Sequence, residues 1–280
     1  MRTNLIRRRA AVCAQAVGLL IAVLWSAFPI FLLLSSSLKK PADIFAVPVK
    51  FIFEPTFGNY VRLWRDWPVF FDSLLNSLII TSGATLLTIV ASALAGWVLS
   101  RCSGRYITGS AFALIVLRLL PPIVITLPLF PVANLLGLND THILLVLLYA
   151  TFFVSLGTWI MKAFFDQIPR ALEEAAANDG ASLRQTLQHV SMPLAVPGMI
   201  AAGVFVFIHA WNDYLFAFIF TTSRAKTAPV VLSEIMGSAT GVDWGVLFAG
   251  ASIQLIPIAI FVIVVQKYLI AGLTAGSVKG

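Results

Sequence analysis

The sequence has few charged residues for its length. Of its 280 residues, 11% are charged and 59% are hydrophobic, whereas an ordinary soluble domain is about 25% charged and about 45–50% apolar. A soluble fold of this size cannot bury so much apolar surface. Together with a mean hydropathy of +0.94, this composition excludes a soluble globular protein and predicts an integral membrane protein.

Cysteines and enzyme motifs are also scarce. The two cysteines, Cys13 and Cys102, have no second metal ligand at a recognisable spacing, so no metal site is predicted. The sequence lacks Gly-x-Ser-x-Gly and His-Glu-x-x-His, which argues against an intramembrane enzyme. It also lacks the Gly-x-x-x-x-Gly-Lys-Ser/Thr phosphate loop. We therefore expect a non-catalytic chain, with no catalytic residue, metal or cofactor of its own.

The net charge of +7 does not indicate nucleic-acid binding. The basic residues are scattered between apolar segments and never form a long stripe. Membrane orientation explains them better, so we expect contact with lipid and none with nucleic acid.

Six apolar runs are each long enough to cross a hydrocarbon core about 30 Å thick, which takes about 20 helical residues. The runs are Ala14–Leu38, Leu74–Leu99, Ile107–Leu136, His142–Phe165, Pro197–Phe220 and Trp244–Tyr268. The sequence therefore predicts an all-α membrane protein with six transmembrane helices in a single domain, residues 1–280.

The first run is expected to be a retained helix, not a signal peptide. Three arginines precede it, as they would in a signal peptide, but the apolar stretch from Ala10 to Leu34 exceeds the 7–15 residues of a signal sequence. The segment 39–73 that follows carries four prolines and charges of both signs, so it is expected to be an extramembrane loop.

Orientation follows from the basic residues near the ends of the runs. With the N-terminus inside, most lysines and arginines fall on the cytoplasmic side, and none lies in the short outer loop near Gly137–Thr141. The loop 39–73 opposes this assignment with five basic residues, but it is longer and also carries four acidic ones. We expect both termini to be cytoplasmic, with residues 1–13 and 269–280 as cytoplasmic ends.

The polar segment 166–196, called the elbow below, separates the fourth and fifth runs. Pro169 suits the start of a short helix, and Gly180 suits the left-handed position that ends it. Ser182 and Gln185 form a capping-box pattern for a second helix, which Pro193 and Pro197 are expected to stop. The elbow is thus predicted to be two short helices hinged at a glycine.

Within the elbow, Glu174-Ala175-Ala176-x-x-Asp179-Gly180-Ala181, followed by Met192-Pro193-Leu194, resembles the EAA loop of binding-protein-dependent ABC importer permeases. In that family the loop is the coupling helix that docks on the ATP-binding subunit. The resemblance implies a type I ABC importer permease fold and the following ATPase-coupling residues: Glu173, Glu174, Ala175, Ala176, Asp179, Gly180, Ala181 and Pro193.

Three further stretches resemble the sugar-uptake branch of that family, in particular the smaller permease of maltose-type importers. They are Asn76-Ser77, Trp211-Asn212-Asp213-Tyr214 and the terminal stretch 272–280. The stretch His189-Val190-Ser191-Met192-Pro193 departs from the family, which more often has an aliphatic residue before Leu-Pro or Met-Pro. The resemblance implies four partners: a second homologous permease, two copies of an ATPase that binds ATP and Mg²⁺, and an extracytoplasmic solute-binding protein. It also implies that the tail, through Gly276 and Lys279, contacts the ATPase.

Polar residues at membrane depth are candidates for the translocation pathway, because charges there normally face the bundle interior or a water-filled cavity. An alternative is that Arg118 and Asp213 pair with each other, or with backbone groups, and lock helices together. If Arg118 faces the cavity, it would favour an anionic solute. The charged candidates are Arg118 and Asp213. Trp211, Asn212 and Tyr214 are candidates because they offer the hydrogen-bonding and stacking surfaces that sugars use, and the alternative is that they serve helix packing.

We therefore expect a permease subunit of an ATP-driven importer in a bacterial inner membrane, which moves a sugar or sugar derivative inward by alternating access. The alternatives within this class are a polyol, an anionic sugar or a glycerophosphate-type solute. A secondary transporter would need inverted repeats and several intramembrane acids, of which only Asp213 stands out.

Overall fold

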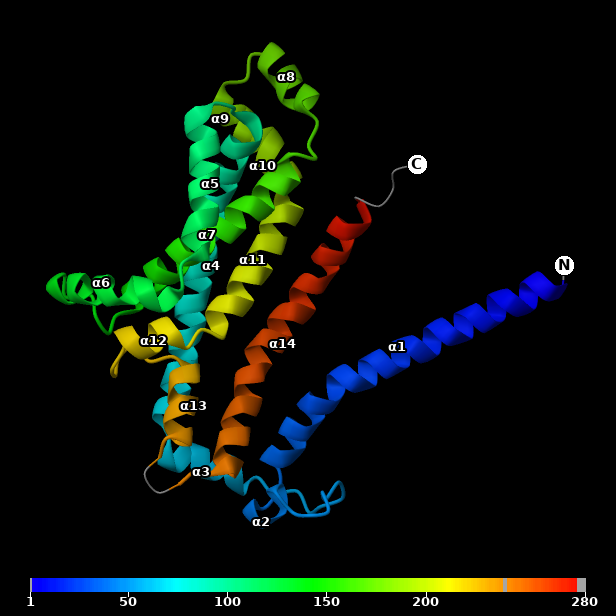
Figure 1. Ribbon diagram of the computed structural model, residues 1–280, viewed down its shortest axis with the longest axis vertical. Helices are drawn as coiled ribbons and strands as arrows, with labels where there is room; N and C mark the ends of the chain where they lie inside the picture. Colours follow the sequence, from blue (N-terminus) through cyan, green and yellow to red (C-terminus); the bar gives the residue numbers. More distant parts are fainter. Residues whose placement is uncertain (1, 239–240, 276–280) are drawn as a thin grey trace. The chain divides into compact units, whose positions relative to one another are not determined.

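The computed structural model describes residues 2–238 and 241–275, and these residues form helices and no strand (Figure 1). The elements are α1 Arg2–Ser37, α2 Pro41–Ile44, α3 Gly58–Asp66, α4 Val69–Arg101, α5 Arg105–Leu119, α6 Pro122–Leu135, α7 His142–Phe165, α8 Arg170–Asn178, α9 Leu183–Thr186, the π-helix η1 Leu187–Ser191, α10 Met192–Leu194, α11 Val196–Trp211, α12 Leu215–Phe220, α13 Ala228–Met236 and α14 Trp244–Ala275.

Four helical segments of the described chain are long and apolar enough to cross a membrane: Val12–Ser37, Val69–Arg101, His142–Phe165 and Trp244–Lys267. Two further pairs of helices meet this criterion only together, because each pair is bent at a short break. The described residues therefore hold four candidate spans, or up to six if each bent pair is one span. The all-helical membrane fold is as predicted.

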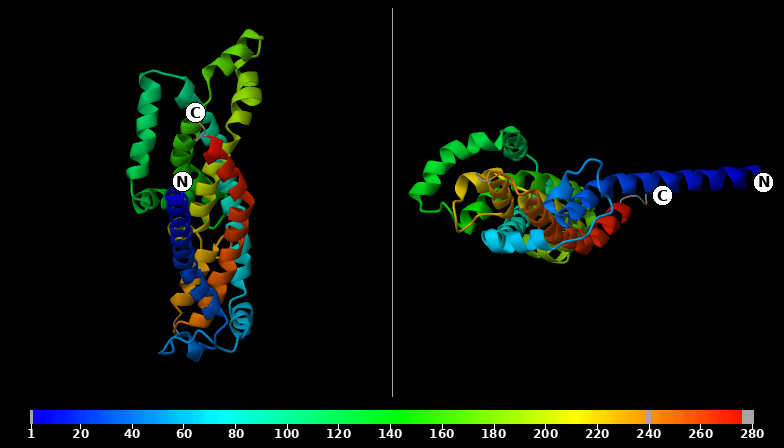
Figure 2. Two further views of the ribbon diagram at one scale, coloured as in Figure 1. Left: turned by 90° about the vertical axis from the view of Figure 1, so that its right-hand side faces the viewer. Right: turned by 90° about the horizontal axis from the view of Figure 1, so that it is seen from below.

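The run Ile107–Leu136 does not form the single straight helix that its apolar length predicts. It is divided into α5 and α6, which meet at 94° (Figures 1 and 2). The physical reason is the pair Pro121-Pro122. A residue before proline is pushed out of the helical region, and Leu120 is extended, with ψ 129°. Pro122 then starts the next helix, where its missing N–H costs nothing.

The run Pro197–Phe220 is also divided. Helix α11 ends at Trp211 and α12 starts at Leu215. Asp213 Oδ1 accepts the backbone N–H of Phe216 at 3.1 Å, and this hydrogen bond caps the second helix. The stretch Trp211–Tyr214 therefore marks a break between two helices.

The chain forms two compact units, and the first comprises Met1–Phe70 and Leu232–Leu255. In this unit, Asn59 is 1% exposed and ties α3 to the segment after α1. Its Nδ2 donates to Ser37 O at 2.7 Å and to Lys39 O at 2.8 Å. Tyr60 of α3 also shares a hydrogen bond of 2.8 Å with the Ser37 hydroxyl.

The second unit comprises Phe71–Val231 and Ile256–Gly280 and contains the elbow. Its core includes Ile80, Leu145, Tyr149, Val206 and Ala217, from α4, α7, α11 and α12, and each is at most 1% exposed. These helices form the support from which the elbow projects.

Candidate functional site

The elbow joins α7 to α11 at one end of the second unit, with α8 at its tip (Figure 1). Helix α8 is followed by Gly180 at φ +88°, a conformation that suits glycine. Ser182 then caps α9, and both reciprocal hydrogen bonds with Gln185 are present. The predicted hinge and capping box are therefore confirmed.

The second helix of the elbow ends between the two prolines that were expected to stop it. Helix α9 continues through the π-helix η1 into α10, and Pro193 lies within α10. The bend of 69° comes at Ala195, between the segments Leu183–Leu194 and Val196–Trp211. The helix therefore ends at Leu194, between Pro193 and Pro197, the two prolines that were predicted to stop it.

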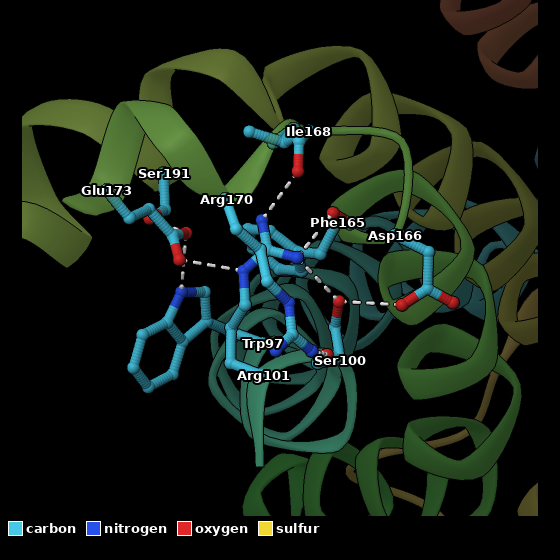
Figure 3. A network of polar contacts seen from close by, with 9 residues as sticks. All are labelled: Trp97, Ser100, Arg101, Phe165, Asp166, Ile168, Arg170, Glu173 and Ser191. Atoms are coloured by element: carbon cyan, nitrogen blue, oxygen red, sulfur yellow. Dashed lines mark hydrogen bonds and ion pairs between the residues drawn. The ribbon is translucent and has the colours of Figure 1, made fainter. Parts of the chain in front are cut away.

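Glu173, on α8, holds the elbow against α4 (Figure 3). Its carboxylate accepts hydrogen bonds from Arg101 Nε at 2.7 Å and Trp97 Nε1 at 3.2 Å, both on α4. It also accepts one from the hydroxyl of Ser191 in η1 at 2.5 Å. One carboxylate thus connects three helical segments.

Arg101 extends this network to the end of α7 (Figure 3). Its Nη1 donates to Phe165 O at 2.9 Å, and its Nη2 donates to Ile168 O at 3.0 Å. The Arg101 and Glu173 side chains are only 8% and 13% exposed. The elbow is therefore fixed to α4 by a largely buried ion pair in which Arg101 also satisfies backbone carbonyls.

The network stabilises the charged form of its acids. Burial opposes ionisation of Glu173, but hydrogen bonds from Ser191, Arg101 and Trp97 outweigh it, so its pKa lies below the usual value for glutamate. Burial likewise opposes ionisation of Asp166, whose pKa is lowered by bonds from Lys162 and Ser100. Both carboxylates are therefore anions at neutral pH.

The other predicted coupling residues have no such internal role. Glu174, Asp179 and Gly180 are exposed on and beside α8, and Ala175 and Pro193 are exposed as well. Ala176 and Ala181 are half-buried. The structure thus separates the two neighbouring acids, with Glu173 turned into the bundle and Glu174 on the surface.

The candidate pathway residues lie around the break between α11 and α12, apart from Arg118. Trp211 is 2% exposed and stacks on Phe207 with ring centroids 6.0 Å apart, so it presents no face to a solute in this structure. Asn212 is exposed and donates to Ile208 O at 2.8 Å. Tyr214 is 37% exposed and stacks on Phe218 at 5.1 Å.

Arg118, near the end of α5, lines a cavity of about 300 Å³ between α5, α6, α7 and α12. Its walls are mainly apolar and include Leu148, Phe152 and Phe216. Among the ion pairs of the described residues, none joins Arg118 to Asp213. A direct pair between these two residues is therefore absent from the described structure, whereas Asp213 does accept a backbone N–H, from Phe216. Arg118 is exposed on the cavity.

A second polar cluster, which the sequence did not predict, surrounds Asp140. This residue has φ +60° and its carboxylate accepts backbone N–H groups of the loop between α12 and α13. The donors are Thr222, Ser223, Arg224 and Ala225, at 3.0–3.1 Å. Asn76 holds the same loop by donating to Arg224 O at 2.9 Å and Lys226 O at 3.0 Å. The motif Asn76-Ser77 is thus a loop support.

Replacing Asp140 with Asn should destabilise the protein by about 1 kcal/mol, because an amide loses the charge-assisted part of these bonds. Asn tolerates a positive φ, so backbone strain does not contribute. Burial opposes ionisation of Asp140, but the backbone N–H groups prevail and lower its pKa, so the effect should persist in mild acid. Thermal unfolding of the purified chain measures it. The exposed Asp72→Asn is the control, and equal midpoints for both variants would contradict the assignment.

Trp97, Arg101 and Ser191 were also missed as site residues, because nothing local in the sequence links them to Glu173. The predicted tail contacts, Gly276 and Lys279, lie outside the described residues.

The fold consists of membrane-spanning helices, and a polar elbow is fixed to the end of one of them, α4. The sequence carries no phosphate loop. These features are typical of the class of transport permeases. Residues 89–274 match the family model described as the binding-protein-dependent transport system inner membrane component, and the chain belongs to this family. It is therefore a non-catalytic, multi-pass membrane subunit of an ABC importer.

Two relatives support this membership over most of the chain. The trehalose transport system permease protein SugB of Mycobacterium tuberculosis is 38% identical over 230 residues, covering 80% of this chain and 82% of the relative. The trehalose/maltose transport system permease protein MalG of Thermococcus litoralis is 34% identical over 267 residues, covering 94% and 95%.

A solved structure confirms the fold. It belongs to a bacterial ABC transporter involved in the import of the acidic polysaccharide alginate, and it matches with a TM-score of 0.75 and 24% identity. The match covers 93% of this chain and 96% of the other.

Proposed function

We propose that this chain is one of two homologous halves of a sugar translocation pathway. The relatives named above are a trehalose permease and a trehalose/maltose permease, and both align with most of the chain. The four long spans and two bent pairs are compatible with six crossings and with both termini in the cytoplasm. The partners are a second permease, two ATPases that carry ATP and Mg²⁺, and an extracytoplasmic solute-binding protein.

The elbow is the part that receives the ATPase motion, and the contrast between its two neighbouring acids carries this proposal. Glu174 and Asp179 are exposed, beside the exposed apolar side chains of Leu172 and Leu183, which are 46% and 69% exposed. This surface suits docking into a cleft of the ATPase. Gly180 and Ala181 form the turn that follows α8. Glu173, on the buried side of α8, fixes this surface to α4.

Motion then passes through the Glu173–Arg101 ion pair into α4 and the end of α7. Because this ion pair is short, largely buried and hydrogen-bonded, a displacement of α8 displaces α4 with little relative movement between them. The bundle responds by largely rigid-body rocking, the usual basis of alternating access.

The solute is a neutral sugar in this proposal, and Asn212 and Tyr214 at the helix break are candidate contacts. Exposed Arg118 in its mainly apolar cavity favours a second candidate, an anionic sugar or glycerophosphate-type solute. Uptake of neutral and anionic sugars by Arg118→Met separates the two, because only anion uptake should fall if Arg118 binds the solute.

The coupling role is tested in the complete importer, reconstituted in proteoliposomes with its binding protein. Glu174→Ala should lower solute uptake by about tenfold, which corresponds to about 1.4 kcal/mol of lost interaction, while assembly with the ATPase stays measurable. Glu54→Ala removes a carboxylate that is 85% exposed in the loop 39–73 and should leave uptake unchanged. Normal, ATP-coupled uptake by Glu174→Ala would refute docking through this residue.

A further inference from the structure

We propose that the first unit contains a carbohydrate-binding pocket of its own, separate from the candidate residues around the α11–α12 break. The pocket lies between α2, α3 and the start of α14. The choice of a sugar as its ligand rests on the proposed sugar function.

The pocket is a cavity of about 440 Å³. Small-molecule sites have volumes of about 300–1,000 Å³, so one or two sugar rings fit. Three segments form the wall: the end of α2 with Phe45, Arg62 on α3, and the stretch Gly241–Gly245 that leads into α14. All of them belong to the first unit.

Two aromatic rings provide a stacking surface. Phe45 and Trp244 lie edge to face, with ring centroids 5.3 Å apart and planes at 85°. Their exposures, 64% and 39%, leave ring faces open to a ligand. The face of an aromatic ring is electron-rich, and the C–H groups on one face of a pyranose carry partial positive charge. Such rings therefore bind sugars by stacking.

Opposite charges supply the hydrogen-bonding groups. Arg62 Nη2 donates to Asp243 Oδ1 at 3.2 Å and to Asn59 Oδ1 at 2.7 Å. Arg62 Nε is buried without a hydrogen-bond partner in the described structure, so the guanidinium keeps an unsatisfied donor. A guanidinium donor beside a carboxylate acceptor suits hydroxyl groups, because each hydroxyl both donates and accepts.

The pair is also electrically neutral overall, which distinguishes the ligand class. A site for an anion would have unpaired arginine or lysine, and a site for a cation would have unpaired acids. Here Arg62 and Asp243 balance each other, so a neutral polyhydroxylated ring is the best match.

The pocket is preformed. Asn59 holds Arg62 in place while its own side chain is fixed by two backbone carbonyls. Asp243 also accepts the N–H of Val246 at 3.2 Å and so caps α14. At Gly245, a Cβ would come within 2.7 Å of Asn59 Cγ, so glycine is what allows α14 to start this close to α3. A fixed site loses little entropy when it binds.

The test uses the full chain in lipid nanodiscs without the binding protein. Saturation-transfer NMR with maltose and trehalose as probes should give saturable signals, and Trp244→Ala and Phe45→Ala should each weaken binding by about tenfold. Arg62→Gln should weaken it to a similar degree. Phe51→Ala, which removes a ring that is 56% exposed outside the pocket, is the matched control and should bind normally.

Several results would overturn the proposal. These are the absence of saturable binding of either disaccharide, binding that survives all three pocket variants, or variants that lose only stimulation of the ATPase by the binding protein. Uptake by the complete importer separates this proposal from the proposed function. If the importer takes up sugar but the pocket binds none, the pocket proposal is wrong and the proposed function is retained. If the importer takes up no sugar, the proposed function itself is contradicted.

Discussion

Replacing Arg101 with Met is expected to lower the stability of the protein by about 3 kcal/mol and to uncouple the elbow from α4. The variant leaves Glu173, 13% exposed, without its cationic partner, and loss of one partner of a largely buried ion pair costs about 3–5 kcal/mol. It also removes the donors to Phe165 O and Ile168 O. Thermal unfolding in detergent measures the first effect, and uptake per ATP hydrolysed measures the second.

Lys162→Met is the matched control. Lys162 pairs with Asp166 at 2.6 Å within the same region, but the two side chains are 27% and 44% exposed. Such pairs contribute about 0.3–0.5 kcal/mol, so the control should change little. The double variant Arg101→Met with Glu173→Gln should recover part of the loss, since it leaves no unpaired charge. If Arg101→Met and Lys162→Met had equal effects, the ion pair would not hold the elbow.

The same ion pair sets a pH dependence. Folded Glu173 has a pKa below the usual 4.5, so its stabilising contribution is fully present above that value and is lost as the pH falls through the folded-state pKa. The unfolding midpoint of the native protein should therefore exceed that of Glu173→Gln at pH 7, and the gap should close in strong acid.

Local chemistry explains what the sequence predicted well. The turn at Gly180 and the Ser182–Gln185 capping box each depend on residues within a few positions of one another. Such patterns determine backbone geometry almost independently of the rest of the fold. The outline of the elbow, two short helices joined at a glycine, is therefore readable from the residues of the elbow itself.

The breaks in the third and fifth runs show where hydropathy alone fails. Apolar content indicates that a segment lies in lipid but does not show whether its helix is continuous. Pro121-Pro122 was a local signal for the first break, and Asp213 was a capping signal for the second. Each of these local signals is weaker than the hydropathy signal of the apolar run that contains it. The length of each run therefore led to the prediction of one unbroken helix.

Contacts between distant residues were not predictable. Glu173 and Arg101 are 72 positions apart, and Asp140 is 82 to 85 positions from its donors. From the sequence, Arg101 was one of the basic residues that indicate the cytoplasmic side, and Asp140 was one residue of the short loop Gly137–Thr141. The roles of Arg101 and Asp140 depend on which helix ends lie next to each other in the folded chain. The spacing of apolar residues along the sequence does not predict those neighbours.

Of the glycines in α4, Gly96 leaves the least room for a side chain against α7. A Cβ at this position would lie 2.6 Å from Met161 Cβ, 2.9 Å from Lys162 N and 3.0 Å from Thr158 O. Two of these atoms are backbone, so no rotamer change relieves the contact. Small residues permit such close packing in membranes, where lipid provides no hydrophobic drive between helices.

Gly96→Ala is therefore expected to destabilise the protein by about 3 kcal/mol, through overpacking that forces α4 and α7 apart. Because Arg101 lies little more than one turn further along α4, the same displacement should lengthen its bonds to Phe165 O and Ile168 O and weaken coupling. Gly109→Ala, in α5 with nothing within 4 Å of the new Cβ, should be neutral or slightly stabilising through better helix propensity. Unfolding midpoints and coupled uptake of the two variants decide the matter, and a Gly96→Ala protein that matches Gly109→Ala in both would show that the helices do not meet there.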